Sequence, residues 1–477
     1  MYSNLELYID GRFIAAGNGR DEEAVFDPAT GQAIAQLPHA TDAEVDEALS
    51  ASKRAFVTWS VTSPLERSDI LRRAASILRS RMEHLCTVMT MEQGKPLAEA
   101  RGEWTHAIEI LEWCAEEGRR VYGRTIRSRF PQTDHIVLQE PVGPCAIFTP
   151  WNFPALCPAR KIAASLAAGC TVIVRASGET PGSAVEIIRA LDEAGLPKGC
   201  AQLLFGPSSK LSERLITAKE IAKISFTGST PVGKQLMALA AQGAKRTTME
   251  LGGNAPVLVF DDCDYERTIA MLKAGKFRNA GQVCVSPARF FVHESLADRF
   301  ARDMADHASS LRLGSGLDPD TTMGPLANAR RVEAMEQFVA DAGSHGGAVL
   351  AGGRRDGNVG NFFQPTVVSG LGTDSLLFSE ECFGPILPVM PFSTVDEAIE
   401  LANGVDAGLA GYAFTSSLDT SRQVMHRMKT GMVGVNTLAI STPEAPFGGV
   451  GESGHGSEGG IEGLQAYLDT KLVSLAS

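Results

Sequence analysis

The sequence predicts an α/β protein with a parallel sheet and more than one lobe. Between residues 145 and 226, short apolar strands alternate with helical stretches, which is the pattern of β-α-β units with right-handed crossovers. A further apolar strand at 255–260 begins a second half of the chain. The length of 477 residues suggests about three domains or lobes, because one hydrophobic core rarely serves so long a chain.

The composition limits the class of protein. With 44% hydrophobic and 21% charged residues, it is typical of a soluble globular protein. The net charge of −12 argues against a nucleic-acid partner, and no apolar run approaches the roughly 20 residues of a membrane span. Residues 1–7 lack the patterns of signal and transit peptides, so we expect a cytoplasmic protein that acts on a small molecule.

The first 140 residues predict one strand–turn–strand unit, several helices and a hairpin. The unit spans 7–13, and the helices cover 41–56, 64–93 and 98–118. Thr41 and Glu44 form the Thr-x-x-Glu pattern of a capping box at the first helix. Strands at 125–130 and 135–139 flank the turn 131–134 and predict a hairpin, which either stays on the surface or pairs with another subunit.

The middle of the chain predicts a nucleotide-binding sheet. Strands are expected at 145–148, 171–174, 202–205 and 224–226, with helices at 154–168 and 182–194. Ligands of such sheets bind at the carboxyl ends of the strands. The turn 227–233 follows the last of these strands, so its glycines either approach a pyrophosphate or make a tight turn.

The second half predicts another α/β lobe. After the strand at 255–260 we expect helices at 295–311 and 330–343 and then a strand-rich tail. The sequence has no internal repeat and no low-complexity linker, so the lobes are expected to be interleaved.

Cys284 is the candidate nucleophile. The nine cysteines are spread singly, with the spacing of neither a zinc site nor a disulfide framework, so no metal is expected. A thiol attacks as thiolate, and a carboxylate such as Glu250 can take its proton or activate water. Taken alone, Cys284 fits a small buried core residue better than a nucleophile, because free cysteine is among the most buried residue types.

Six motifs are spread along the whole chain. They are Pro150-Trp151-Asn152-Phe153-Pro154, Phe226-Thr227-Gly228-Ser229, Glu250-Leu251-Gly252-Gly253, Gly281-Gln282-Val283-Cys284, Glu381-x-Phe383-Gly384-Pro385 and Pro446-Phe447-Gly448-Gly449. In order and spacing they resemble the motifs of the NAD(P)-dependent aldehyde dehydrogenases.

The resemblance implies two Rossmann-type α/β lobes and a small β oligomerisation arm. It divides the chain into a dinucleotide-binding domain (1–121 and 141–251), a catalytic domain (252–452) and the arm (122–140 and 453–477). It also implies a homodimer or homotetramer.

The resemblance further implies a thiohemiacetal and a thioester on Cys284. The Asn152 amide and the Cys284 backbone N–H would hold the oxyanion, and Glu250 would activate the hydrolytic water. Lys161 and Glu381 would orient the nicotinamide half of NAD(P)+, with Phe383 packed against it. The implied cofactor-binding residues are Thr149, Pro150, Trp151, Arg175, Ser177, Gly178, Phe226, Thr227, Gly228, Ser229, Gly233, Leu251, Glu381 and Phe383.

Three residues point to a carboxylate on the substrate. Arg160, Arg278 and Ser441 are similar to the trio that grips the distal carboxylate in succinate-semialdehyde dehydrogenases, and two guanidinium groups with a hydroxyl suit that anion. Phe153 and Phe447 would line the same site. Either arginine alone could make an ordinary ion pair. The 2-oxoglutarate-semialdehyde dehydrogenases are the alternative, because they also resemble much of the chain, including 117–120.

The sequence departs from the family pattern at the expected adenosine end. A glutamate that binds the ribose hydroxyls and repels a 2′-phosphate is replaced by Gly178. With Arg175 and Ser177 nearby, the residues admit NADP+ as well as NAD+. Ser286 stands where some succinate-semialdehyde enzymes carry a second cysteine, and Gly451 replaces a common lysine.

The sequence has two alternatives to an aldehyde dehydrogenase that hydrolyses its thioester. A CoA-acylating dehydrogenase would pass the thioester to CoA, whereas Glu250 is expected to serve hydrolysis. A non-enzymatic role is open to any fold, but Cys284, Glu250 and Asn152 are all present.

Overall fold

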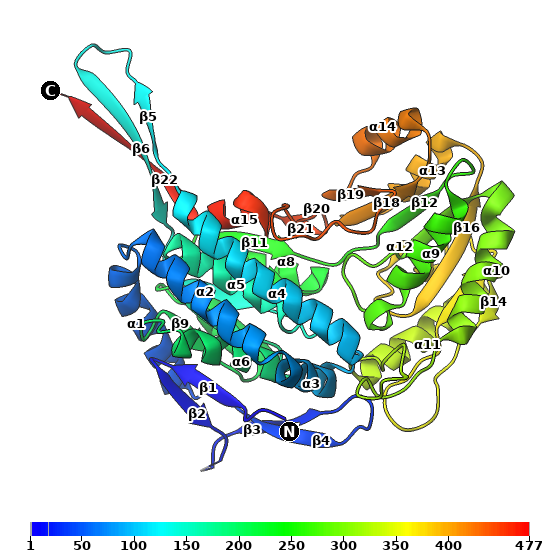
Figure 1. Cartoon of the computed structure of the whole chain (residues 1–477), viewed down its shortest axis with the longest axis horizontal. Helices are drawn as coiled ribbons and strands as arrows, with labels where there is room; N and C mark the ends of the chain where they lie inside the picture. The colour runs from blue at the N-terminus through cyan, green and yellow to red at the C-terminus, as the bar shows by residue number, and fades with distance from the viewer. Residues whose placement is uncertain (1, 18, 477) are drawn as a thin grey trace.

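The computed structural model describes residues 2–17 and 19–476, so the outermost residues of the predicted domain ranges, 1 and 477, lie outside it. It consists of two α/β lobes and a narrow arm that projects from the first lobe (Figure 1). Within the described residues, no helix is both long and apolar enough to cross a membrane.

The first lobe contains an eight-stranded sheet whose centre is parallel. The strand order is β2-β1-β9-β8-β7-β10-β11-β21, and β7 to β11 pair in parallel. The parallel strands β7 to β10 were predicted, whereas β11 was not. The bounds are β1 Glu6–Ile9, β2 Arg12–Ala15, β7 Cys145–Phe148, β8 Val172–Arg175, β9 Ala201–Leu203, β10 Lys223–Thr227, β11 Arg246–Glu250 and β21 Gly454–His455.

Helices cover this sheet at nearly the predicted positions. The capping box of Thr41 and Glu44 is present at α1. The single helix predicted over 64–93 is two helices, because the chain bends at Arg81 (φ −105°, ψ 9°). The bounds are α1 Asp42–Trp59, α2 Pro64–Ser80, α3 Met82–Gln93, α4 Leu97–Glu117, α5 Leu156–Ala168, α6 Pro181–Glu193, α7 Ser208–Thr217 and α8 Thr230–Ala241.

The second lobe contains a seven-stranded sheet with the order β14-β15-β16-β13-β12-β18-β19. Its strands are β12 Pro256–Val259, β13 Arg289–His293, β14 Ala348–Ala351, β15 Thr366–Ser369, β16 Ile386–Phe392, β18 Ala410–Phe414 and β19 Met432–Val435. Its helices are α9 Tyr265–Lys276, α10 Glu294–Ser310, α11 Ala329–Ser344, α12 Leu376–Ser379, α13 Val395–Ala402 and α14 Leu418–Arg427. The strand-rich tail therefore also contains helices. The sequence analysis missed α12, α13 and α14 in this tail and α9 before it.

Each lobe has its own hydrophobic core. One cluster of buried side chains lies between Leu5 and Leu251 and returns at Leu464–Leu468, and the other lies between Ala255 and Phe447. The chain crosses between the cores just after β11, so Glu250 stands at the boundary between the lobes.

The arm is a three-stranded antiparallel sheet of β5 (Arg124–Arg127), β6 (Thr133–Pro141) and β22 (Leu468–Ala476). The predicted hairpin is therefore present. The range 453–477 also contributes β21 to the first sheet and α15 (Gly460–Gln465), which packs against α5. This range is thus shared between the arm and the first lobe, and the domain boundaries stay a prediction.

Three short elements complete the surroundings of the site. The hairpin of β3 (Glu22–Phe26) and β4 (Ala33–Pro38) lies beside the first sheet. The 3₁₀ turn η2 (Arg278–Gly281) precedes Cys284, and β17 (Ala407–Gly408) pairs with β20 (Val450–Gly451).

Candidate active site

The loop before Cys284 has an unusual backbone. Asn279 and Ala280 both have φ 51°, and Gly281 has φ 72°, so three consecutive residues are left-handed. For residues with a side chain this costs about 1–2 kcal/mol each. A Cβ on Gly281 would overlap the backbone carbonyl of Gly384, so only glycine fits there.

Hydrogen bonds from the first lobe hold this loop. The Glu99 carboxylate on α4 accepts from the Asn279 backbone N–H at 2.7 Å. The Asn279 side-chain nitrogen donates to the carbonyl oxygens of Asn152 (3.0 Å) and Gln282 (3.2 Å). These hydrogen bonds therefore offset the cost of the left-handed conformation, as is typical of functional sites.

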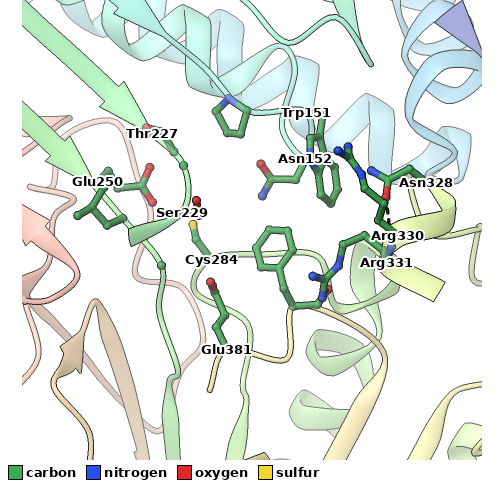
Figure 2. A pocket seen from close by; sticks show the side chains of 15 residues that line it. Trp151, Asn152, Thr227, Ser229, Glu250, Cys284, Asn328, Arg330, Arg331 and Glu381 are labelled. Carbon is green, nitrogen blue, oxygen red and sulfur yellow. Dashed lines mark hydrogen bonds between the residues drawn. The ribbon is translucent and has the colours of Figure 1, made fainter. Parts of the chain in front are cut away.

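Cys284 lies where two cavities meet. A cavity of about 350 Å³ opens on one side of it, and a cavity of about 460 Å³ on the other; Cys284 and Glu250 line both. Figure 2 shows Cys284 in the first cavity, with Glu250, Asn152 and Glu381 around it. The geometry therefore brings together the predicted nucleophile, base and oxyanion donor.

The electrostatics keep the Cys284 thiol protonated at rest. Burial raises the pKa of Cys284 well above its usual value, and the neighbouring Glu250 carboxylate raises it further. Burial also raises the pKa of Glu250, as does the Glu458 carboxylate, while the Lys161 ammonium opposes this shift. The thiol must therefore lose its proton as it attacks, and Glu250 is adjacent to receive it.

Asn152 is placed to stabilise an oxyanion. Its side-chain nitrogen donates one hydrogen bond, of 3.1 Å, to the Gln282 carbonyl in the nucleophile loop. An amide nitrogen carries two protons, so the second remains for an oxygen on a carbon bound to Cys284.

Lys161 does not line the cofactor-side cavity. Its ammonium group is fully buried in an ion pair with Glu458. Because α5 directs this side chain into the lobe, its role toward the nicotinamide half stays a prediction. Its effect reaches the site through the charge it places near Glu250.

The 350 Å³ cavity contains most of the predicted nicotinamide-side residues, namely Pro150, Trp151, Thr227, Gly228, Ser229, Leu251, Glu381 and Phe383. The Glu381 carboxylate accepts from the Gly253 N–H at 3.0 Å, and burial raises the pKa of Glu381 to about 7. The Trp151 and Phe383 rings meet edge to face with centroids 5.6 Å apart. The sequence analysis missed Asn328, Arg330 and Arg331, which α11 and its N-cap bring to this cavity.

Three predicted cofactor residues support the cavity wall instead of lining it. Thr149 is buried behind Pro150. Phe226 lies beneath Gly228, where a Cβ would overlap its ring, and Gly233 faces the Leu251 side chain in the same way. The glycines of this turn therefore serve close packing, while Gly228 and Ser229 lead into the N-terminus of α8, where backbone N–H groups favour a phosphate.

A third cavity of about 600 Å³ adjoins the first at Asn328 and Arg330, which line both. Arg175, Ser177 and Gly178 line it at the carboxyl end of β8, as predicted for the adenosine end. The residues thus fit a dinucleotide that extends from Cys284 to β8.

One premise about this end is wrong. Gly178 does not leave the place without a carboxylate, because a Cβ there would overlap a carboxylate oxygen of Glu23 and lie 3.2 Å from its carboxyl carbon. Glu23 is distant from Gly178 in the sequence, so no local pattern links the two residues.

The 460 Å³ cavity brings all five predicted substrate residues together. Arg160, Arg278, Ser441, Phe153 and Phe447 line it with Cys284. The Arg160 guanidinium donates to the Ser441 hydroxyl at 2.6 Å and lies over the Phe447 ring at 4.2 Å. The Arg278 guanidinium lies over the Phe153 ring at 5.8 Å.

His106 on α4 also lines this cavity and was missed. Its buried Nε2 has no hydrogen-bond partner in the described part of the chain. Burial lowers the pKa of His106 to about 4, and Arg160 and Arg278 add to this effect, so the ring is neutral at pH 7. A histidine on a helical stretch gave no signal, because its approach to two arginines depends on the tertiary fold.

The fold and the site are those expected of a nucleotide-binding α/β enzyme with a cysteine nucleophile. The family model described as "Aldehyde dehydrogenase family" matches residues 14–473. The chain therefore belongs to the aldehyde dehydrogenase family, whose members use NAD(P)+, and it is an aldehyde dehydrogenase.

Individual relatives are similar over nearly the whole chain. The chain is 41% identical to 3-sulfolactaldehyde dehydrogenase of Pseudomonas putida over 470 residues, covering 98% of this chain and 96% of that one. It is 42% identical to the mitochondrial succinate-semialdehyde dehydrogenase of Arabidopsis thaliana over 451 residues, covering 94% and 85%. The crystal structure of succinate-semialdehyde dehydrogenase from Burkholderia pseudomallei matches with a TM-score of 0.97 and 40% identity, covering 99% and 98%.

Proposed function

We propose that this enzyme oxidises a short aldehyde that carries a distal anionic group, and that its substrate is succinate semialdehyde, converted to succinate with NAD(P)+. The observation that carries the proposal is the single cavity that Cys284 shares with Arg160, Arg278 and Ser441. An aldehyde whose anion lies between the two guanidinium groups would present its other end to the thiol.

The residues have distinct roles in this reaction. Cys284 attacks the carbonyl carbon as its proton passes to Glu250, while Asn152 and the Cys284 backbone N–H hold the oxygen of the thiohemiacetal. Bound NAD(P)+ supplies the hydride acceptor. Glu250, once it has released its proton, activates the water that hydrolyses the thioester, and Cys284 is freed.

The names of the relatives support an anionic substrate. Besides the sulfolactaldehyde and succinate-semialdehyde enzymes, a glutarate-semialdehyde dehydrogenase of Pseudomonas aeruginosa is 38% identical over 470 residues. Each of these named substrates carries a carboxylate or a sulfonate, which suits a pair of arginines.

A longer or sulfonate-bearing aldehyde is the second candidate. 2-Oxoglutarate semialdehyde would need room for one more carbon and a keto oxygen. In the tautomer in which His106 Nε2 carries the proton, this unpartnered nitrogen would add a donor beside the arginines and suit a group with more acceptor oxygens than a carboxylate. A sulfonate has three such oxygens.

Replacing Arg160 or Arg278 with Ala should lower kcat/KM for succinate semialdehyde about tenfold to more than hundredfold, since a charge-assisted hydrogen bond contributes about 1.5–3 kcal/mol. Butanal has the same number of carbons but no anion, so its kcat/KM should change far less. Arg299→Ala, which alters an exposed arginine on α10, is the control. Equal losses on both aldehydes would reduce the two arginines to structural residues. A wild-type preference for a longer or sulfonated aldehyde would select the second candidate.

We also propose that the arm joins subunits into a homodimer or homotetramer. Its strands expose large apolar side chains, including Ile126, Leu472 and Leu475, with 43%, 61% and 53% of their surfaces accessible.

Leu472→Glu should lower the molar mass measured by light scattering, because a charge in an apolar interface costs several kcal/mol. Leu418→Glu changes an equally exposed leucine on α14 and should not lower it. A wild-type monomer, or an unchanged mass for Leu472→Glu, would contradict the role of the arm.

A further inference from the structure

Glu23 lies against the adenosine end of the cofactor site. It is on β3, at the position that pairs with Leu37 of β4. Its carboxylate and the Leu37 side chain both pack on the backbone of Gly178: a Cβ at Gly178 would lie 3.2 Å from the Glu23 carboxyl carbon and 3.4 Å from a Leu37 methyl carbon. A side chain at 178 would therefore displace the Glu23 carboxylate from its present position.

The strand fixes which way Glu23 points. Side chains alternate along a strand, so Glu23 shares a face with Val25, which is 1% exposed in the core of the first lobe, whereas Glu22 takes the opposite face. Leu37 is fully buried beside it. The backbone that carries Glu23 is therefore anchored, while about half of its side chain stays accessible in the cavity.

The place is the one where a nucleotide ribose is recognised in such sheets. Gly178 follows β8 closely, at the carboxyl edge of the parallel strands. In dinucleotide-binding sheets a carboxylate near this edge accepts hydrogen bonds from the ribose hydroxyls, and a nearby arginine instead accommodates a 2′-phosphate. A carboxylate and an arginine are both present here. Their charges and existing partners therefore decide whether the site suits the ribose hydroxyls or a 2′-phosphate.

The existing partners favour the carboxylate. The Arg175 guanidinium already donates to the Ser208 hydroxyl and faces the charges of Glu23 and Glu179. The second arginine of this cavity, Arg330, is paired with Glu179 at 2.5 Å. Among the described residues that line the cavity, three carboxylates (Glu23, Asp27 and Glu179) face two guanidinium groups. An added phosphate dianion would meet an excess of negative charge. A neutral diol would meet the Glu23 carboxylate, whose partner is the His39 ring, with Nε2 at 3.5 Å from a carboxylate oxygen.

We propose that Glu23 binds the adenosine ribose hydroxyls and makes the enzyme prefer NAD+ to NADP+. The carboxylate that Gly178 lacks is supplied from β3, about 155 residues earlier in the chain. The inference rests on the proposed function only in requiring that a nicotinamide dinucleotide binds, and it is independent of the aldehyde.

The test is the dissociation constants of NAD+ and NADP+, measured by titration calorimetry without aldehyde. The wild type should bind NAD+ more tightly. Glu23→Gln keeps the shape but removes the charge, so NAD+ should bind about tenfold more weakly, NADP+ should bind more tightly, and the ratio of the two constants should shift by more than tenfold. Glu22→Gln removes a charge one residue away on the other face of the strand and should leave the ratio unchanged.

Gly178 provides a second test that does not depend on Glu23→Gln. A glutamate at 178 needs the space that Glu23 fills, so Gly178→Glu alone should weaken the binding of both nucleotides. The double variant Glu23→Ala/Gly178→Glu frees that space and should return toward the wild-type preference for NAD+. A wild type that prefers NADP+, or a Glu23→Gln variant with an unchanged ratio, would overturn the proposal. Failure of the anion site, by contrast, would appear only in assays with aldehydes.

Discussion

Replacing Cys284 with Ala should reduce aldehyde oxidation to the background rate while leaving the dissociation constant of NAD+ nearly unchanged. The thiol is the group that would form the covalent intermediates, and no neighbouring residue can take over its bond to carbon. The two cavities proposed for the cofactor are lined mainly by other residues, in the loops after β7, β8 and β10 and at the start of α11. The measurement is reduced-cofactor formation at 340 nm, together with calorimetric binding.

Cys157 is the matched control for this experiment. It lines the substrate cavity, and burial raises its pKa, with Glu250 adding to the shift as it does for Cys284. Cys157→Ala should keep most of the turnover, because this thiol is on α5 and faces the side of the cavity. Turnover above a few per cent in Cys284→Ala would show that another residue carries the attack.

Replacing Glu250 with Gln should arrest the enzyme after one turnover. The first hydride transfer should survive, so a burst of about one reduced cofactor per site should appear, while steady-state turnover falls about hundredfold or more because the thioester lacks a base for its water. Rapid mixing at 340 nm separates the two phases. Loss of the burst, accompanied by slower alkylation of Cys284, would show instead that Glu250 mainly activates the thiol.

The pH dependence provides a companion measurement in the wild type. Burial and the Glu458 carboxylate raise the pKa of Glu250, and only the ionised carboxylate acts as a base. Steady-state turnover should therefore fall as the pH drops through this raised pKa, which is above the range of an exposed glutamate. In Glu250→Gln this limb of the pH profile should disappear from the residual rate.

Local sequence patterns predicted the strands and helix ends that are determined by neighbouring residues in the chain. The parallel strands from β7 to β10 follow from apolar runs between helical stretches, and the start of α1 follows from the capping box of Thr41 and Glu44. The split between α2 and α3 was missed because Arg81 is neither Gly nor Pro, so no breaker marks it.

The candidate site was predicted where motifs carry it and missed where distant segments meet. Cys284, Glu250 and Asn152 come together as expected. The partner of Lys161, Glu458, lies 297 residues away, and Glu23 reaches Gly178 from another hairpin. No pattern within one stretch of sequence reports such pairs, because they arise from tertiary packing alone.

The proposed anion site spans both lobes, because Arg278 and Ser441 lie in the second lobe with Cys284 but Arg160 does not. Arg160 is on α5 of the first lobe, whereas Cys284 is on a loop of the second, and the two lobes have separate cores. The distance between Arg160 and Cys284 is therefore set by the docking of one lobe on the other, through bonds such as that between Glu99 and Asn279. If Arg160 binds the anion, the position of one lobe relative to the other determines which carbon-chain length fits. Relatives with identical cavity linings could differ in the length they accept, and substitutions remote from the cavity could retune it.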